Sequence, residues 1–368
     1  MTRAQVAVLK TSPATVLDDY GRLMDMVGFD RFLPRDQDTL IKLNLSWTKY
    51  FPACSSEPWQ VEGVVRHLLR RGYAAERLLP VENRTVVTQP HQGARNNLWI
   101  PVLQRYGLGF TALTEVEWVK YEFRGPLLKL QEIFPQGIEI PKMFIGRNVL
   151  HLPTMKTHGH STTTGAVKNA FGGLLKEVRH YAHKYIHEVL VDLLIMQREL
   201  HPGVFAVMDG TVCGDGAGPR TMIPRIGNYI LASGDSVAID AVAAKMMGFD
   251  PMSIGYLRMA HERGLGVADA KEIEVLGEDV SGVNLGFHVR RSFVIWGDQM
   301  IRKGPLRSLE KLLLHSPLVP WSWHASNLYH DHLWLPLIGR GRIRQFMQTE
   351  WGRLFQAYAG GGPQGGAL

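Results

Sequence analysis

Cysteine is almost absent from this chain, which has only Cys54 and Cys213 among its 368 residues. Neither belongs to a CxxC pair or to a ferredoxin-type cysteine run. We therefore expect no iron–sulfur cluster held by the chain's own thiolates. A disulfide is not expected either, because a reducing cytosol keeps thiols reduced.

Long apolar segments are absent too. No apolar run reaches the roughly 18 residues that a membrane-spanning helix needs. The first ten residues lack the apolar core of a signal peptide and read as a β-strand. The sequence therefore predicts a cytoplasmic protein that is either free or peripheral to the inner face of the membrane.

Familiar catalytic signatures are missing as well. The chain has no GxSxG elbow, no kinase signature, no HExxH motif and neither a GxGxxG nor a Walker-type loop. Any function must therefore be read from the placement of polar residues relative to predicted strands and helices.

The sequence does contain a regular alternation of short apolar runs and amphipathic segments. Hydrophobic residues make up 45% of the chain, enough for one large α/β domain or two smaller ones. The predicted strands span residues 6–9, 39–45, 77–81, 148–152, 204–208, 229–232 and 272–276. The predicted helices span residues 16–27, 61–69, 101–106, 189–200, 237–247 and 254–263. This order predicts an α/β core over residues 1–285, with a mostly parallel sheet covered by helices in two Rossmann-like lobes, about 1–145 and 146–285.

The last quarter of the chain has a different character. Residues 286–368 hold ten Lys and Arg residues against four Asp and Glu, and five of the nine tryptophans. We predict a helical, aromatic and basic extension over residues 286–359, followed by a Gly-rich flexible tail over 360–368. Such an extension suits contact with a membrane surface, packing on the core or a homodimer interface. Nucleic-acid binding is the least favoured partner, because the rest of the chain is nearly balanced in charge.

The segment Lys156–Asn169, KTHGHSTTTGAVKN, is the most informative stretch of the sequence. It follows a predicted strand and leads into a helix-like segment, which is how open α/β sheets build anion and substrate sites. Lys156 and Lys168 are candidates to hold a phosphate or carboxylate, or to serve as base or nucleophile. His158 is a candidate general base, although a histidine bonded to a loop carbonyl is more common.

Other polar residues follow predicted strands, where a doubly wound sheet binds ligands. We predict catalytic roles for Lys156, His158, Lys168 and Asp209. We predict substrate-binding roles for Lys42, Asn44, Glu82, Thr157, Thr164, Asn169, Asp215, Gly216, Gly218, Ser233 and Asp235. The alternative for any one of them is an ordinary loop residue or helix cap.

Two further patterns carry weaker predictions. His158, His183 and His187 are candidate metal ligands, but their spacing matches no recognised metal motif. Cys213 to Pro219, a Gly-rich stretch after a strand, is either a phosphate-cradling loop or a flexible substrate loop, with Asp215 as a cation or hydroxyl ligand.

Taken in order, these residues resemble the family called domain of unknown function 362 over about residues 5–280. The resemblance rests on Ile41–Leu45, on Lys156-Thr-His158 with Thr164–Asn169 and Gly172, on Asp192-Leu193, on Met208–Gly210 with Gly216, Gly218 and Pro219, and on Ser233–Asp240 with Gly248. It implies an α/β fold and suggests redox work, since many members carry a ferredoxin-like segment. This chain lacks that segment, and the aromatic, basic extension stands in its place. A distant, fold-level similarity to nickel-pincer racemases would imply a metal-dependent isomerase.

Three functional hypotheses follow. The first is an enzyme, oxidoreductase or isomerase, acting on a small anionic or oxygenated metabolite with the Lys156–Asn169 segment as its active-site element. The second is a non-catalytic ligand-binding or scaffold protein attached to a membrane through its extension. The third is the metal-dependent racemase. An enzyme site predicts a strongly perturbed lysine or histidine pKa, whereas a scaffold predicts ordinary values.

Overall fold

The structure is a computed structural model that describes residues 3–85, 88–176, 179–290, 293–302, 304 and 320–361. Ten strands form one mixed sheet, and two more form a small separate sheet. The large sheet contains β1 (Ala4–Lys10), β2 (Thr39–Lys42), β3 (Leu78–Glu82), β4 (Thr111–Ala112), β7 (Asn148–His151), β8 (Thr154–His158), β9 (Thr162–Thr163), β10 (Val204–Ala217), β11 (Thr221–Ser233) and β12 (Ile273–Gly277). The small sheet contains β5 (Trp118–Tyr121) and β6 (Ile138–Pro141).

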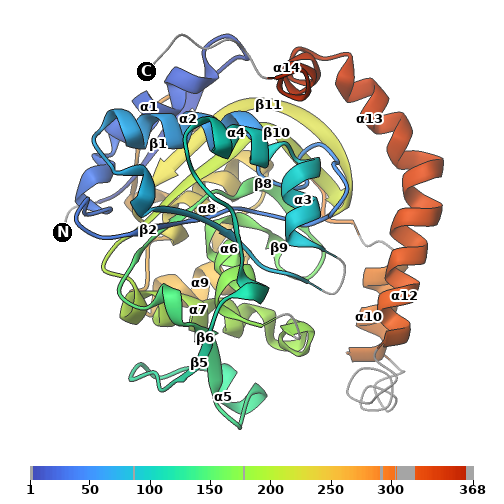
Figure 1. Cartoon of the computed structure of the whole chain (residues 1–368). Coiled ribbons are helices and arrows are strands. Elements are labelled where there is room, and N and C mark those ends of the chain that lie inside the picture. The colour runs from blue at the N-terminus through green and yellow to red at the C-terminus, as the bar shows by residue number, and fades with distance from the viewer. Residues whose placement is uncertain are drawn as a thin grey trace.

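Helices connect most of these strands (Figure 1). They are α1 (Val16–Met26), α2 (Pro58–Arg70), α3 (Pro90–Asn96), α4 (Trp99–Arg105), α5 (Leu130–Ile133), α6 (Gly165–Leu174), α7 (Ile186–Leu200), α8 (Ser236–Met247) and α9 (Gly255–Glu262). Short 3₁₀ turns are η1 (Phe29–Arg31), η2 (Ala75–Arg77), η3 (Leu113–Glu115), η4 (Lys142–Phe144), η5 (Arg179–Tyr185), η6 (Pro251–Ser253) and η7 (Ala270–Glu272). The C-terminal elements are α10 (Phe293–Arg302), α12 (Pro320–Asn327), η9 (Leu328–Gly339), α13 (Arg340–Met347) and α14 (Glu350–Ala359).

The strand order of the large sheet is β12-β1-β11-β10-β7-β2-β3-β4, with β8 and β9 attached beside β10. The pairs from β10 through β7, β2 and β3 to β4 are all parallel, as is the pair of β1 and β12. On this path β11 alone runs antiparallel to its neighbours. The mostly parallel α/β sheet predicted from the sequence is confirmed.

Two hydrophobic cores lie on the two faces of the sheet. Successive strand residues alternate between them, so Val6 and Val8 join one core while Ala7 and Leu9 join the other. Helices α6 to α9 cover the first face, and α1, α2 and α4 cover the second. Strands buried on both faces explain why the predicted strands were nearly continuous apolar runs.

Strands from both predicted lobes alternate within this one sheet. In the sheet, β1 lies between β12 and β11, and β7 lies between β10 and β2. The boundary predicted near residue 145 therefore does not separate two sheets.

Local sequence explains where α8 begins and ends. The carboxylate of Asp235 caps the helix by accepting hydrogen bonds from the backbone N–H groups of Val237 and Ala238. Gly248 ends it with a positive φ of 101°, a conformation that favours glycine. The Ala-rich helix predicted over residues 237–247 is confirmed, and Asp235 serves as its cap.

The C-terminal elements form a helical segment along one side of the domain (Figure 1). Trp351, Phe355 and Tyr358 of α14 are buried in the core on the α1–α2 face of the sheet. The Trp351 indole donates a 2.7 Å hydrogen bond to Asn228 Oδ1 of β11. The predicted helical extension is therefore present where it is described, while most of the 360–368 tail lies outside the described residues.

Candidate functional site

Polar side chains converge at the carboxyl ends of β2, β3, β7 and β8. Parallel pairing places these ends at one edge, with Lys42 of β2 opposite Val81 of β3 and opposite His151 of β7. Helix α6, which follows β9, crosses the same edge. The converging residues are all at most 8% exposed: Lys42, Asn44, Glu82, His151, Lys156 and Asn169.

Lys42 and Glu82 form a buried ion pair with a 2.8 Å separation between Nζ and Oε1. The Lys42 ammonium also donates to the carbonyl of Leu43 at 2.6 Å. Glycines of α6 allow the helix to approach this pair, because a Cβ at Gly172 would lie 3.2 Å from Lys42 Nζ. The pair and the helix therefore close one side of the site.

Lys156 is the centre of the cluster and is fully buried. Its ammonium donates to Asn44 Oδ1 at 2.5 Å, to Ser46 Oγ at 3.0 Å and to the Cys54 carbonyl at 2.5 Å. Three acceptors match the three protons of an ammonium. Burial nevertheless lowers the pKa of Lys156 to about 8. A proton can therefore leave this lysine close to neutral pH.

A hydrogen-bonded chain of side chains runs from Lys156 across the sheet edge to α7. Asn44 Nδ2 donates to Asn169 Oδ1 at 3.3 Å, and Asn169 Nδ2 approaches His151 Nδ1 at 3.4 Å. His151 Nε2 then lies 2.6 Å from Gln197 Oε1. Burial lowers the pKa of His151 to about 3, so the ring is neutral with its proton on Nε2. In every hydrogen bond of the chain the donor therefore lies on the Lys156 side and the acceptor on the Gln197 side.

The structure brings together five residues proposed from the sequence, namely Lys42, Asn44, Glu82, Lys156 and Asn169. Sequence reasoning missed His151, Gln197, Ser46, Cys54 and Glu57, which complete their surroundings. His151 lies near the end of the predicted strand 148–152 and could have been found by the same rule that selected Lys42. The others have no such signal, because they come from a loop, a helix start and the buried side of an amphipathic helix.

Glu57 adds a second buried acid near Lys156. It is 1% exposed, accepts a hydrogen bond from the backbone N–H of Ala53 at 3.2 Å, and lies 3.4 Å from the Tyr50 hydroxyl. Burial, followed by the charge of Asp209, raises the pKa of Glu57 well above its usual range, whereas Lys156 acts to lower it. Glu57 is therefore a protonatable group beside the lysine cluster.

The N-terminus of α6 is not open to a ligand. The Asp240 carboxylate accepts from the backbone N–H groups of Ala166 at 2.5 Å and Val167 at 3.1 Å, and from the Tyr256 hydroxyl at 3.2 Å. Burial raises the pKa of Asp240 to about 7. These amides are therefore occupied by a carboxylate of the chain itself.

Thr164 lies directly before α6, and its backbone N–H donates to the Lys156 carbonyl at 3.0 Å. Its hydroxyl is buried and has no hydrogen-bond partner among the described residues. Thr164 therefore holds the Lys156 strand through its backbone, and its side chain is a spare polar group at the site.

His158 and Lys168 lie on the side of the site that faces η5. His158 Nδ1 accepts from the backbone N–H groups of His160 at 3.2 Å and Ser161 at 3.4 Å. Burial, and then the charge of Lys168, lowers the pKa of His158 well below its usual range. The ring is therefore neutral with its proton on Nε2.

The three histidines considered as metal ligands are not brought together. His183 lies against His160, with ring centroids 5.3 Å apart, whereas His187 stacks on Tyr256. Among the described residues no group of three or more His, Cys, Asp or Glu side chains is placed to hold a metal ion. His183 and His187 do not share one helical face, because His183 lies in the 3₁₀ segment η5 and His187 lies in α7.

The Gly-rich stretch from Cys213 to Pro219 is mainly strand. Residues 213–217 belong to β10, so the predicted flexible loop is wrong except at the turn that follows. Thr157 Oγ1 donates to the carbonyl of Gly216 at 3.0 Å, and a Cβ at Gly218 would lie 1.8 Å from the Thr157 carbonyl oxygen. These glycines let the β10–β11 hairpin pack closely on β8 and do not cradle a phosphate.

Asp215 is likewise a structural residue of the hairpin. Its Oδ2 accepts from Arg225 Nε at 2.8 Å and Nη2 at 2.7 Å, and its Oδ1 accepts from the backbone N–H of His288 at 2.9 Å. Both oxygens are therefore engaged by the chain itself.

Asp209 lies in the core, where it pairs with Thr154 of β8. It is fully buried and accepts hydrogen bonds from Tyr20, Trp59 and both the backbone and hydroxyl of Thr211, at 2.7–3.0 Å. Because it accepts from four donors, its carboxylate connects β10 to α1 and α2. Its pKa is raised by burial.

Ser233 and Asp235 lie away from Lys156 along the β10–β11 hairpin, because Lys156 pairs with Gly214 near the far end of β10. They follow β11, which runs antiparallel to β10, so Ser233 pairs with Ala206 near the start of β10. Ser233 is level with His151 and Lys42 along the strands, but the side chains of Ser233 and Asp235 are engaged elsewhere. The Ser233 hydroxyl donates to the Gln5 carbonyl at 2.6 Å, and Asp235 caps α8.

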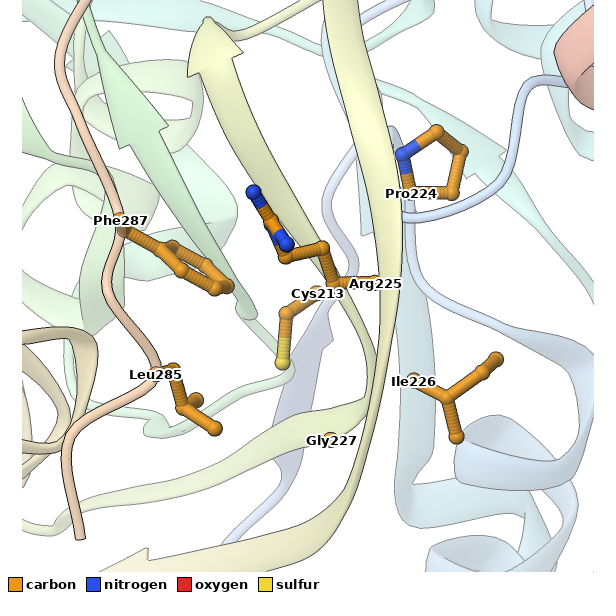
Figure 2. Close-up of a pocket in the computed structure, with 7 residues that line it drawn as sticks. All are labelled: Cys213, Pro224, Arg225, Ile226, Gly227, Leu285 and Phe287. Carbon is orange, nitrogen blue, oxygen red and sulfur yellow. The ribbon is translucent and has the colours of Figure 1, made fainter.

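A separate cavity of about 380 Å³ lies beside the hairpin. It is lined by Cys213, Pro224, Arg225, Ile226, Gly227, Leu285 and Phe287. Figure 2 shows Cys213 and Arg225 on the hairpin facing Leu285 and Phe287 on the neighbouring chain segment. Burial raises the pKa of the Cys213 thiol, so this cysteine has no activated thiolate. The cavity lies apart from the lysine cluster.

The fold and this site define a mixed α/β protein with a buried lysine and amide network at the carboxyl edge of its sheet. The chain belongs to the family described as domain of unknown function (DUF362), whose model matches residues 39–245, more than half of the chain. That match includes every residue of the network from Lys42 to Gln197. The C-terminal helices lie beyond it.

One curated relative is the thylakoid-associated protein sll1697 of Synechocystis sp.. It is 26% identical over 176 residues, which make up 47% of this chain and 52% of the relative. The chain therefore spans about half the length of the curated relative it matches.

Proposed function

We propose that this protein is an enzyme that acts on a small anionic or oxygenated metabolite, with Lys156 as its proton-transfer group. The observation that carries the proposal is a fully buried lysine with a pKa lowered to about 8 at the carboxyl edge of the sheet. A perturbed lysine in such a position is more typical of an active site than of a scaffold.

In this proposal each part of the cluster has a role. Lys156 accepts a proton as the neutral amine, and Asn44 orients it through the chain that ends at Gln197. The Lys42–Glu82 pair keeps the edge of the sheet rigid. His158, the last residue of β8, and Lys168 of α6 supply the groups that attract and polarise the substrate.

Access to Lys156 requires movement of the connection between β2 and α2. Ser46 and Cys54 belong to this connection and provide two of the three acceptors of the ammonium. A substrate that displaces them would also remove two hydrogen bonds that favour the charged lysine. The loss of these two hydrogen bonds would favour the neutral amine, which is the form that accepts a proton from the substrate.

Native mass spectrometry with elemental analysis on freshly purified full-length protein tests the proposal. We expect a small molecule to accompany the wild type and to be lost from Lys156→Met, while the exposed-lysine variant Lys120→Met retains it. Equal retention of the molecule by Lys156→Met would contradict the assignment of Lys156. A wild type that carries nothing and shows an ordinary lysine pKa at this position would contradict the enzyme.

A second candidate function is attachment to a membrane surface. The relative named as thylakoid-associated favours it, and so do the exposed apolar side chains of the C-terminal helices. Fractionation of cells expressing the full chain tests it: we expect protein in the membrane pellet that high salt or carbonate releases. Recovery wholly in the supernatant at low salt would contradict it.

A further inference from the structure

The helical segment from α12 through η9 to α13 has two different faces. Its inner face packs on the domain, where Trp334 and Leu335 are 7% and 8% exposed. Trp334 lies 5.4 Å from Phe51 and 6.1 Å from Trp47, measured between ring centroids. This face covers the same β2–α2 connection that surrounds Lys156.

The outer face of η9 consists of Leu328, Leu333, Leu337 and Ile338. Their exposed fractions are 56%, 49%, 79% and 44%. With Trp296 of α10, five of the nine large hydrophobic residues that are exposed among the described residues belong to the C-terminal helices. Isolated exposed leucines are common, but four exposed aliphatic side chains on the same face of one helix form a contact surface.

Polar contacts fix the orientation of this helix. The Trp47 indole donates to Asp331 Oδ1 at 2.7 Å, and Lys49 lies 3.4 Å from Asp331 Oδ2. At the other end, Arg342 donates to the Met222 carbonyl at 2.6 Å. The inner face is therefore held by several contacts, and the apolar outer face cannot turn inward without breaking them.

Basic side chains continue the outer face beyond the leucines. Arg340 and Arg344 are exposed, and neither has an ion-pair partner in the part of the chain that the structure describes. Between Leu328 and Met347 the sequence has one acidic residue, Asp331, which the contacts on the inner side already engage. A second copy of the chain would bring no free carboxylate to these arginines through this face. An anionic lipid bilayer offers both an apolar interior and phosphates.

We infer that the outer face of η9, with Arg340 and Arg344, is a docking surface for a bilayer containing anionic lipids. The inference rests on the membrane attachment proposed above and names the surface and the lipid chemistry. The helix lies along the bilayer, because its inner face remains packed on the domain. Leu337 and Ile338 enter the acyl region, while the two arginines contact headgroup phosphates.

Sedimentation of the full-length protein with vesicles tests this surface. One set of vesicles contains phosphatidylcholine alone and the other contains phosphatidylcholine with about one third phosphatidylglycerol. We expect binding to the anionic vesicles, a loss of at least about tenfold in Leu337→Asp/Ile338→Asp, and a loss of about tenfold in Arg340→Gln/Arg344→Gln that added salt reproduces in the wild type.

The matched control is Ile145→Asp, because Ile145 is 41% exposed and lies between η4 and β7, outside the C-terminal helices. It should bind vesicles like the wild type. Circular dichroism confirms that each variant is folded, which is expected because the substituted side chains are exposed.

The possible outcomes distinguish a failure of the proposed docking surface from a failure of the proposed membrane attachment. If the wild type and all variants bind anionic vesicles equally, membrane attachment stands and this surface is wrong. If the wild type binds neither vesicle, both proposals are overturned. If the wild type forms dimers that Leu337→Asp/Ile338→Asp dissociates and binds no vesicle, a second copy is the occupant and the lipid inference is overturned.

Discussion

The Lys156 network and the outer face of η9 are two exceptions to the rule that charged side chains are exposed and apolar side chains are buried. Lys156 is a cation with no exposed surface, whereas Leu337 is a leucine with 79% of its surface exposed. The buried cation is compensated within the chain by three acceptors. Burial in a lipid or protein partner is what would compensate the exposed leucine.

The two regions also differ in their relation to the family. The family match over residues 39–245 contains the whole network, while η9 lies outside it. The Lys156 network therefore lies in the part of the chain that matches the family, whereas the outer face of η9 lies in the C-terminal helices beyond that match. The predictions below test each side of this comparison, in order of expected effect.

The largest effect is expected at the buried ion pair. Replacing Lys42 by Met leaves Glu82, 3% exposed, without its partner. We expect a loss of about 3–5 kcal/mol in the free energy of unfolding, measured with urea, because the remaining buried carboxylate is uncompensated.

The exposed pair of Lys142 and Glu117 is the matched control for this change. Its separation is 2.9 Å, but both side chains are 61% exposed. Lys142→Met should cost at most about 1 kcal/mol. Equal costs for the two lysine variants would mean that the Lys42 pair is solvated and that the network is not closed.

The next effect is a pH dependence from Lys156. Its pKa is about 8 in the folded protein against an ordinary value of 10.5, so the unfolded chain binds more protons between these pH values. Stability should therefore rise with pH across this window, by roughly 2–3 kcal/mol between pH 8 and pH 10. The rise should be absent in Lys156→Met, as measured by urea unfolding at each pH.

Lys120→Met, at an exposed position, provides the control and should keep the wild-type dependence. The same slope in Lys156→Met and wild type would show that Lys156 titrates normally. The enzyme proposal would then lose its main support.

A smaller pH effect is expected from His151. Its folded pKa is about 3 against 6.5 in the unfolded chain, so folding disfavours the protonated ring. Stability present at pH 7 should therefore fall as the pH drops below 6.5, by about 2 kcal/mol at pH 5 for this residue. His151→Gln should lose this part of the acid sensitivity in thermal unfolding at pH 7 and pH 5.

Replacement of the exposed His332 by Gln should leave the acid sensitivity unchanged. His201, whose pKa is lowered to about 4 by burial, adds a similar contribution that both variants retain. A wild-type acid response in His151→Gln would mean that the ring is solvated and the chain from Lys156 to Gln197 is broken there.

The smallest effect on folding is expected on η9. Leu337→Asp should change the free energy of unfolding by no more than about 0.5 kcal/mol, because its side chain contacts mainly solvent. Trp334→Ala, on the inner face of the same helix, should cost about 3–5 kcal/mol. Thermal unfolding of the two variants checks the difference, and similar costs would show that the two faces are not distinct.

Much of the fold could be predicted because strands and helices leave local patterns. The strand at 148–152 and the helix at 189–200 are confirmed within a few residues, as β7 and α7. The strands at 204–208 and 229–232 were predicted too short. Their Gly-rich and polar outer halves read as loop, but they pair with each other in a long hairpin.

The candidate site could be predicted only in part. Lys42 and Glu82 end the parallel strands β2 and β3, and Lys156 comes soon after β7, so one rule placed them together. Ser233 and Asp235 satisfy the same rule in the sequence, but their side chains are engaged elsewhere. Asp240 was part of the family resemblance, but the sequence does not show that it caps α6. The N–H group that it accepts from, that of Ala166, is 74 positions away in the chain.

The sequence by itself determined the alternation of buried strands and amphipathic helices, the absence of a cysteine cluster and the concentration of arginine and tryptophan near the C-terminus. These follow from residue type and spacing, which act over a few turns of chain. Only the tertiary structure decided that β11 runs antiparallel, that Lys156 is saturated by Asn44, Ser46 and Cys54, and that Leu337 faces outward. Such contacts join residues far apart in the chain, and their free energies depend on burial that no local pattern specifies.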